Sequence, residues 1–231
     1  DNTTGENNVA IGREALEDNT TADYNVAIGS YALQKNTTGA QNIAIGGQAA
    51  DANTTGTRNI AIGYTAYSAS DTENDNLAIG YAAMITNTAG GQYNTAIGNY
   101  ALDALTSGDN NVAMGYNALT ANTTGADGVA IGYGALKSNL TSNSSIGIGW
   151  EELGLLTNGN NNVAIGYASN RANLTCTDNV SGGGNSLQLN TASSNTAIGK
   201  SALTANTTGA ENTTVGTSAL AANTTAGGNT A

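Results

Sequence analysis

The residues best suited to chemistry in this chain are acidic, and they occur in two small groups. Asp71, Glu73 and Asp75 alternate along the chain, and three oxygen donors at this spacing could hold Ca²⁺. Glu151 and Glu152 are adjacent, but glycoside hydrolysis needs a second carboxylate at a fixed place across a cleft. We interpret both groups more simply as solvated charged corners.

The composition excludes most other catalytic chemistry. The 231 residues include no His and one Cys, so zinc, haem, cysteine-protease and Ser-His-Asp chemistry lack their usual groups. We therefore expect no enzyme activity and no cofactor. Six basic and seventeen acidic residues give a formal net charge of −11, the wrong sign for nucleic acid. No apolar run approaches the ~18 residues of a membrane span, so we expect no membrane insertion in this segment.

An internal repeat dominates the sequence. The motif Asn-Val-Ala-Ile-Gly at residues 8–12 recurs at a spacing of seventeen residues, with one step of eighteen and one of sixteen. Thirteen copies follow the consensus Asn-(Val/Ile/Thr)-Ala-Ile-Gly-x-x-Ala-Leu-x-x-Asn-Thr-Thr-Gly-x-x, whose positions we number as places 1 to 17. Residues 1–231 are therefore one repeat array. Both ends stop inside a repeat, which predicts a fragment of a longer fibre or a subunit of a filament.

Each repeat predicts one short strand followed by a turn. Val9, Ala10 and Ile11 show the period-2 alternation of a strand, and the following Gly can turn the chain. The Ala-Leu pair lies in a segment too short for a helix. The Asn-Thr-Thr corners match the N-glycosylation pattern, but Asn and Gly are equally the residues of tight turns. We predict an all-β fold, a parallel β-solenoid of about thirteen coils.

Equivalent side chains of such coils stack into columns. We predict that Val and Ile at places 2 and 4, with Leu at place 9, form a thin interior, and that Asn at place 1 forms a hydrogen-bonded ladder. By alternation, the alanines of place 3 then form an outer apolar strip that needs a partner. We therefore predict a parallel homo-oligomer, preferably a trimer. The strip comprises Ala10, Ala27, Ala44, Ala61, Ala78, Ala96, Ala113, Ala130, Ala164 and Ala197.

Aromatic residues gather at place 6, directly after the motif glycine. This aromatic column could stack against the sugar rings of a cell-surface glycan. The alternative is that the rings only stabilise adjacent strands. The column comprises Tyr64, Tyr81, Tyr116, Tyr133, Trp150 and Tyr167.

The repeat is least regular around residues 139–156 and 171–194. Departures of this kind predict loops that protrude on one face. Cys176 lies in the second stretch. Because a lone Cys cannot close an intrachain disulfide, we interpret it as a buried or free thiol.

The motif Asn-Val-Ala-Ile-Gly-Tyr-x-Ala-Leu resembles the repeats of YadA-like heads of trimeric autotransporter adhesins. The longer form with Asn-Thr-Thr-Gly is similar to repeat regions of bacteriophage tail fibres. The resemblance covers essentially the whole chain, although the period here is longer than is usual in the family. It implies a left-handed parallel β-roll, three chains side by side, and attachment to host surfaces from a bacterial cell surface or a virion.

Our leading hypothesis is a structural and adhesive fibre segment that spaces or presents a receptor-binding surface for a host glycan or protein. One alternative is an end-to-end extracellular filament subunit, and another is a monomeric ligand-binding or ice-binding β-solenoid. A glycan-degrading enzyme on a β-helix would need carboxylates facing each other across a groove, and the sequence offers only scattered acids.

Overall fold

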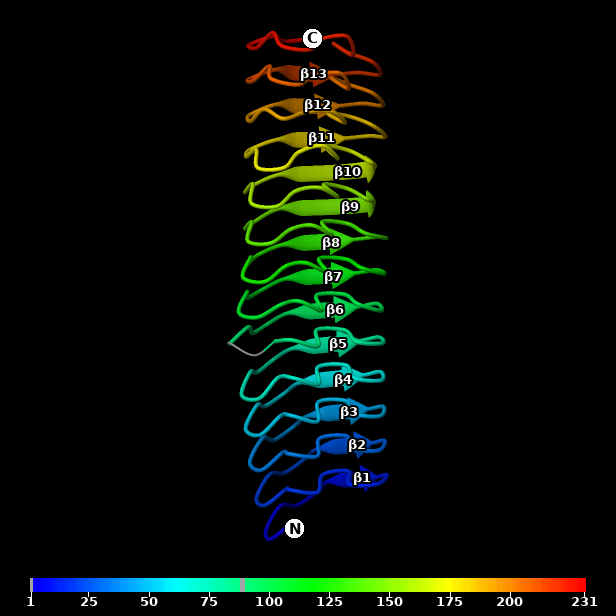
Figure 1. Ribbon diagram of the computed structural model, residues 1–231, viewed down its shortest axis with the longest axis vertical. Coiled ribbons are helices and arrows are strands. Elements are labelled where there is room, and N and C mark those ends of the chain that lie inside the picture. Colours follow the sequence, from blue (N-terminus) through cyan, green and yellow to red (C-terminus); the bar gives the residue numbers. More distant parts are fainter. Residues whose placement is uncertain (1, 88–89) are drawn as a thin grey trace. The chain divides into compact units, whose positions relative to one another are not determined.

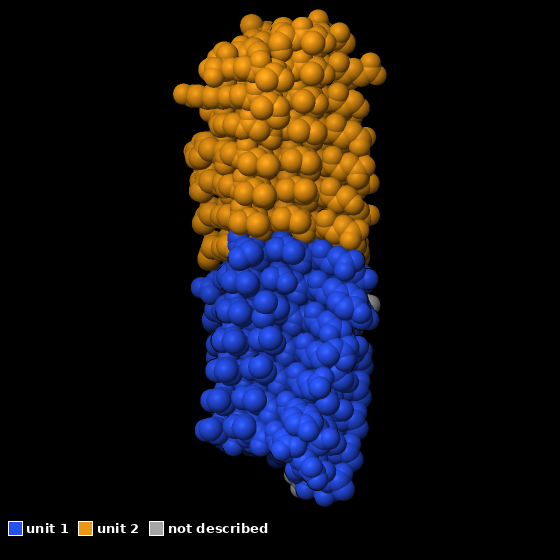
Figure 2. Space-filling view, turned by 180° about the vertical axis from the view of Figure 1, so that it is seen from behind, with its two compact units in different colours: residues 1–114 blue, residues 115–231 orange. Residues whose placement is uncertain are grey.

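The chain is an all-β parallel β-solenoid of about twelve turns. The computed structural model describes residues 2–87 and 90–231, and the chain divides into two compact units, residues 1–114 (unit 1) and 115–231 (unit 2). Figure 2 colours the two units separately. Each unit is built from coils that contribute one strand apiece, so the predicted all-β solenoid is confirmed.

In unit 1 the strands pair in parallel in chain order (Figure 1). Val26 lies beside Val9 on one side and Ile43 on the other, so equivalent places of successive coils are in register. The strands are β1 (Val9–Ile11), β2 (Val26–Ile28), β3 (Ile43–Ile45), β4 (Ile60–Ile62), β5 (Leu77–Ile79), β6 (Thr95–Ile97) and β7 (Val112–Met114).

Unit 2 follows the same pattern with two longer strands. β9 and β10 extend through place 6, so that Tyr167 pairs with Trp150. The strands are β8 (Val129–Ile131), β9 (Ile146–Trp150), β10 (Val163–Tyr167), β11 (Val180–Gly182), β12 (Thr196–Ile198) and β13 (Thr213–Val215). The register continues through the coils around 139–156 and 171–194, where we expected protruding loops. These coils differ from the others in their side chains.

Five places line the narrow interior of a typical coil: Asn at places 1 and 12, Ala at places 3 and 8, and Leu at place 9. In unit 1, Ala27, Ala32 and Leu33 are fully buried. In unit 2, Leu187 and Leu203 belong to one such cluster. Leu at place 9 was correctly predicted as an interior residue. The apolar core is therefore a column of Leu that faces two columns of Ala.

The strand side chains point in the direction opposite to our prediction. The alanines of place 3 face the interior, while Val and Ile of places 2 and 4 face outward and are half-buried or exposed. Leu at place 9 fills most of the interior from the opposite wall and leaves room for little more than a methyl group. The alanine strip is therefore not an oligomer interface. Ala27, Ala44, Ala61, Ala78, Ala96, Ala113, Ala130, Ala164 and Ala197 are fully buried, and Ala10 is exposed in the first coil.

The asparagines of place 1 form the predicted ladder. The Asn42 backbone N–H donates to Asn25 Oδ1 at 2.8 Å, and Asn42 Oδ1 accepts from the Asn59 N–H at 2.9 Å. Asn42 Nδ2 donates to the Gly56 carbonyl at 2.7 Å. Asn42 thus binds the preceding coil through its backbone N–H and the following coil through its side-chain oxygen, while its side-chain nitrogen binds within its own coil. The ladder satisfies polar groups that the interior hides from water.

The Asn-Thr-Thr corners are turns held by their own side chains. Asn36 Nδ2 donates to the Gly39 carbonyl at 2.9 Å, and Thr37 Oγ1 donates to the Thr54 carbonyl of the next coil at 3.0 Å. This confirms the turn interpretation of the corner motif. The hydroxyl of the first corner Thr is directed to backbone, and it is the second, such as Thr38, that is exposed.

The Ala-Leu segment is a run of tight turns. Its leucines have left-handed backbone, as in Leu33 with φ 49° and Leu119 with φ 50°. A non-glycine residue in this region costs roughly 1–2 kcal/mol, which the burial of each Leu side chain offsets. The turns bring place 9 back over place 3, and this return closes the interior.

Candidate functional site

An exposed aromatic stack runs along unit 2. The ring centroids of Tyr116 and Tyr133 are 5.5 Å apart, those of Tyr133 and Trp150 6.1 Å, and those of Trp150 and Tyr167 4.9 Å. The interplanar angles are 12°, 10° and 7°, so the rings lie face to face. The in-register coils place equivalent residues side by side, which explains the stack. All four side chains are exposed.

The column continues differently in unit 1. Tyr64 and Tyr81 stack at 5.9 Å with an angle of 14°, but Tyr81 meets Tyr100 edge-on at 71°. Asn99 holds the next place of the column, and its Oδ1 accepts the Tyr81 backbone N–H at 3.0 Å. The aromatic residues of place 6 thus stack on one another in successive coils of each unit, as predicted. This stacking contributes to the contact between neighbouring coils. The role of the aromatic column in ligand binding remains a prediction.

An ion network lies beside the stack, on the residue that follows Trp150. Glu151 accepts from Lys137 Nζ at 2.5 Å and from an Arg171 guanidinium nitrogen at 3.2 Å. Lys137 and Arg171 belong to the coils before and after Glu151, so the network links three coils. Glu151 and Glu152 are both buried, so our interpretation of this pair as a solvated charged corner was wrong.

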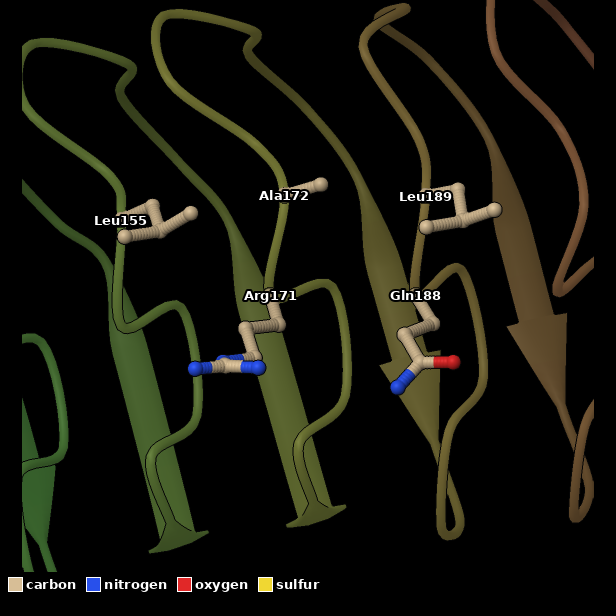
Figure 3. Close-up of a pocket in the computed structure, with 5 residues that line it drawn as sticks. All are labelled: Leu155, Arg171, Ala172, Gln188 and Leu189. Carbon is tan, nitrogen blue, oxygen red and sulfur yellow. The ribbon is translucent and has the colours of Figure 1, made fainter.

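A surface depression of about 310 Å³ adjoins this network (Figure 3). Leu155, Ala172 and Leu189 occupy place 11 of three successive coils, and Arg171 and Gln188 occupy place 10. Leu155 and Leu189 are exposed, and so are two further leucines nearby in the sequence, Leu140 and Leu174 at place 13. Sequence reasoning missed these leucines. The available signal was an apolar residue at places that are polar or small in regular coils.

The same coils have polar side chains at interior places that hold alanine in the regular coils. Glu152, Ser169 and Ser186 replace Ala at place 8, and Ser181 replaces Ala at place 3. The Ser169 hydroxyl contacts the Ser181 hydroxyl at 2.6 Å and the Ser186 hydroxyl at 2.9 Å. Glu152 Oε2 accepts the Ser169 N–H at 2.7 Å, whereas Oε1 is buried with no hydrogen-bond partner in the described structure.

Burial of Glu152 should make the stability of unit 2 depend on pH. Desolvation raises the pKa of Glu152 from 4.5 to about 7, opposed by the hydrogen bond from Ser169. Between about pH 4.5 and 7 the unfolded chain loses this proton while the folded chain keeps it, so stability falls as the pH rises. We expect the free energy of unfolding of Glu152→Gln, relative to that of the unchanged protein, to be roughly 3 kcal/mol higher at pH 8 than at pH 4. Denaturant unfolding at several pH values measures this difference.

Glu211→Gln removes one exposed carboxylate from the same unit and controls for net charge. Unfolding free energies of Glu152→Gln and the unchanged protein that run parallel from pH 4 to pH 8 would contradict the prediction. Glu151, the neighbouring carboxylate, points to Lys137 and Arg171 and not to Glu152.

The three alternating acids do not converge on one site. Asp71 contacts Thr54 of the preceding coil, and Glu73 is buried with Oε2 accepting the Asp71 N–H at 2.9 Å. Asp75 forms a two-point pair with Arg58 at 2.6 and 2.7 Å, which lowers the pKa of Asp75. Among the described residues, no three His, Cys, Asp or Glu side chains group to hold a metal. The arrangement therefore gives no support to the Ca²⁺ alternative, and our interpretation of the group as a solvated corner was wrong for Glu73, which is buried.

Cys176 is half-buried and free of disulfide bonds. Burial raises the pKa of its thiol, so the reactive thiolate is disfavoured. Its backbone N–H donates to Asn173 Oδ1 at 2.8 Å in a corner of the usual kind. The residue serves the turn in which it lies.

The fold and its surface columns define a parallel β-solenoid repeat protein. Comparison with protein-family models, with curated proteins and with solved structures gives no match. Over residues 2–87 and 90–231, no helix has the length and apolar character needed to cross a membrane.

Proposed function

We propose that this chain is a structural and adhesive segment of an extracellular fibre, in which three copies associate in parallel. In each unit, Val and Ile of places 2 and 4 point outward on consecutive coils and form a surface that we call the Val/Ile face. The proposed interface between the copies is this face and not the alanine strip. The fibre would stand on a bacterial cell surface or form part of a virion tail fibre, and would space or present a surface that binds a host glycan or protein.

Exposure of the Val/Ile face supports self-association. In unit 2, Ile165 is 47% exposed and Ile198 is 41% exposed, although isoleucine is among the residues most often buried in proteins. Each coil offers on the order of 100 Å² of exposed Val and Ile surface. Six or seven coils therefore approach the area that each partner buries in a typical protein interface, about 800 Å². An apolar strip of this size is typical of an interaction site.

The periodicity of the face favours copies of the same chain as partners. Equivalent side chains recur at one coil step, about 4.8 Å along the sheet. A parallel second copy presents the same spacing, so that ridges of one chain fit the intervals of the other along the full contact. Three chains around one axis, each a left-handed roll, is the arrangement that the adhesin resemblance implies.

Light scattering tests the proposal, and we expect a mass near three times the 22.9 kDa of one chain, independent of concentration. The variant combines Ile131→Lys, Ile148→Glu and Ile165→Lys, which replaces the apolar side chain of place 4 with a charged one in three successive coils. The alternating signs let neighbouring coils pair their charges, so each chain keeps its fold. We expect this variant to dissociate to monomers.

A matched control carries the same charges on an exposed column away from the face. Thr124→Lys, Thr141→Glu and Asn158→Lys occupy place 14 of adjoining coils. This control should keep the mass of the unchanged protein. A monomer at every concentration would contradict the proposal and favour the monomeric solenoid. A mass that grows with concentration would favour end-to-end filament assembly instead.

A further inference from the structure

The aromatic stack of unit 2 stops at a glycine. After Tyr167, the next residue of the column is Gly184, and the one after it is Lys200. Tyr167 is 55% exposed, and its backbone carbonyl accepts the Asn185 N–H at 2.9 Å, so the coil of Gly184 continues directly beside it. The column therefore has one position without a side chain between an aromatic ring and a cation.

The space above Gly184 is open, unlike that above comparable glycines. A Cβ atom at Gly47, also at place 6, would lie 3.2 Å from the Tyr64 ring, which leans over it. A Cβ at Gly182 would lie 3.2 Å from Ile198 Cδ1. A Cβ at Gly184 would meet no atom within 4 Å. Neighbouring side chains thus cover the other two glycines and leave this one uncovered.

The dimensions of this gap suit a single six-membered ring. Successive coils are about 4.8 Å apart, so two coil steps, about 10 Å, separate the backbones of Tyr167 and Lys200. Rings within the stack already lie 4.9–6.1 Å apart. One further ring can therefore rest on the outer face of Tyr167 and still leave room for the Lys200 side chain beyond it.

Lys200 supplies a positive charge that is not already committed. Four of the six basic residues, Arg13, Arg58, Lys137 and Arg171, pair with carboxylates. Lys200 is exposed, and within the described ranges no carboxylate lies at ion-pair distance from its ammonium group. Such a cation beside an exposed ring favours an anionic ligand over a neutral one at this position.

We propose that the gap over Gly184 binds one carboxylated pyranose ring of a surface polysaccharide. The apolar C–H face of the sugar stacks on Tyr167, and its carboxylate meets the Lys200 ammonium group. Sugars of this class combine a flat apolar face with a charged edge, which matches the two walls of the gap. A site of this kind would make acidic polysaccharides the receptor class of the adhesive fibre segment, and the proposal therefore rests on the proposed function.

Titration with a galacturonic acid tetrasaccharide tests the site. Trp150 is the sole tryptophan and stacks on Tyr167, so its fluorescence reports a ring added to the stack. We expect saturable binding with a dissociation constant of about 1 mM. Gly184→Tyr fills the gap with a fifth ring and should weaken binding by at least about tenfold. Thr217→Tyr adds a ring to the same column outside the gap and should leave binding unchanged.

Lys200→Gln and a neutral galactose tetrasaccharide distinguish the contribution of the Lys200 charge to binding from that of stacking on Tyr167. We expect Lys200→Gln to reduce affinity for the acidic probe several-fold at low salt, and the neutral probe to bind more weakly than the acidic one. Equal binding of both probes, no binding by the unchanged protein, or full binding by Gly184→Tyr would each overturn the proposal. Light scattering on the same samples reports self-association independently, so failure of the sugar site and failure of the fibre proposal give different results.

Discussion

Gly132→Ala should unfold much of unit 2. Gly132 closes its strand with φ 127°, a conformation that L side chains rarely adopt. A Cβ atom there would overlap the Gly149 carbonyl oxygen and lie 2.7 Å from the Gly149 carbonyl carbon in the next coil. Because the atoms that the Cβ would meet belong to the backbone of the next coil, no side-chain rotation can relieve the overlap. We expect a loss on the order of 4 kcal/mol or more, measured by denaturant unfolding followed by circular dichroism.

Gly184→Ala is the matched control for this substitution. It lies in the same unit, lacks the positive φ of the closing glycines, and its Cβ would meet nothing within 4 Å. We expect a change within about 0.5 kcal/mol. Similar stability losses in Gly132→Ala and Gly184→Ala would show that backbone contact between coils is not what requires glycine at place 5.

Asn42→Ala should destabilise unit 1 by about 3 kcal/mol, because it breaks the ladder at a buried rung. The Asn59 N–H would lose its acceptor, and the Gly56 carbonyl would keep only the longer hydrogen bond from Asn53 Nδ2 at 3.1 Å. Both groups are in the interior, where water cannot replace the lost partner without opening the coil. Thermal and denaturant unfolding of the full chain measure the loss.

Thr38→Ala is the control for the ladder variant. Thr38 is exposed at place 14 of the coil that precedes Asn42, and we expect its replacement to be nearly neutral. A cost for Asn42→Ala no larger than that of Thr38→Ala would mean that the ladder hydrogen bonds contribute little beyond what water offers the unfolded chain.

The aromatic column shows how far the sequence predicts a candidate site in a repeat protein. The constant period places Tyr133 and Trp150 at equivalent positions, and the register of the coils then brings their rings together. The gap at Gly184 could not be predicted in the same way. The sequence has glycine at place 6 in two coils, and only the packing of Tyr64 over Gly47 shows that one is covered and the other open.

The exposed leucines show a related limit. Leu155 and Leu189 break the polar pattern of their places, and the sequence marks their coils as irregular. Irregularity alone predicted protruding loops. The coils instead keep their register, since the strand pairing of β9 and β10 continues through five residues, and the change falls on which side chains face outward.

The sequence by itself determined the repeat, the strand in every coil, the parallel register and the asparagine ladder. Each of these depends on the period and on local residue type. Only the tertiary structure decided which face of the strand turns inward. Alternation groups Val26 with Ile28 and sets Ala27 opposite, but it is symmetric with respect to inside and outside. The left-handed turns bring Leu at place 9 over the strand, and the volume that this side chain occupies leaves alanine as the residue that fits beneath it.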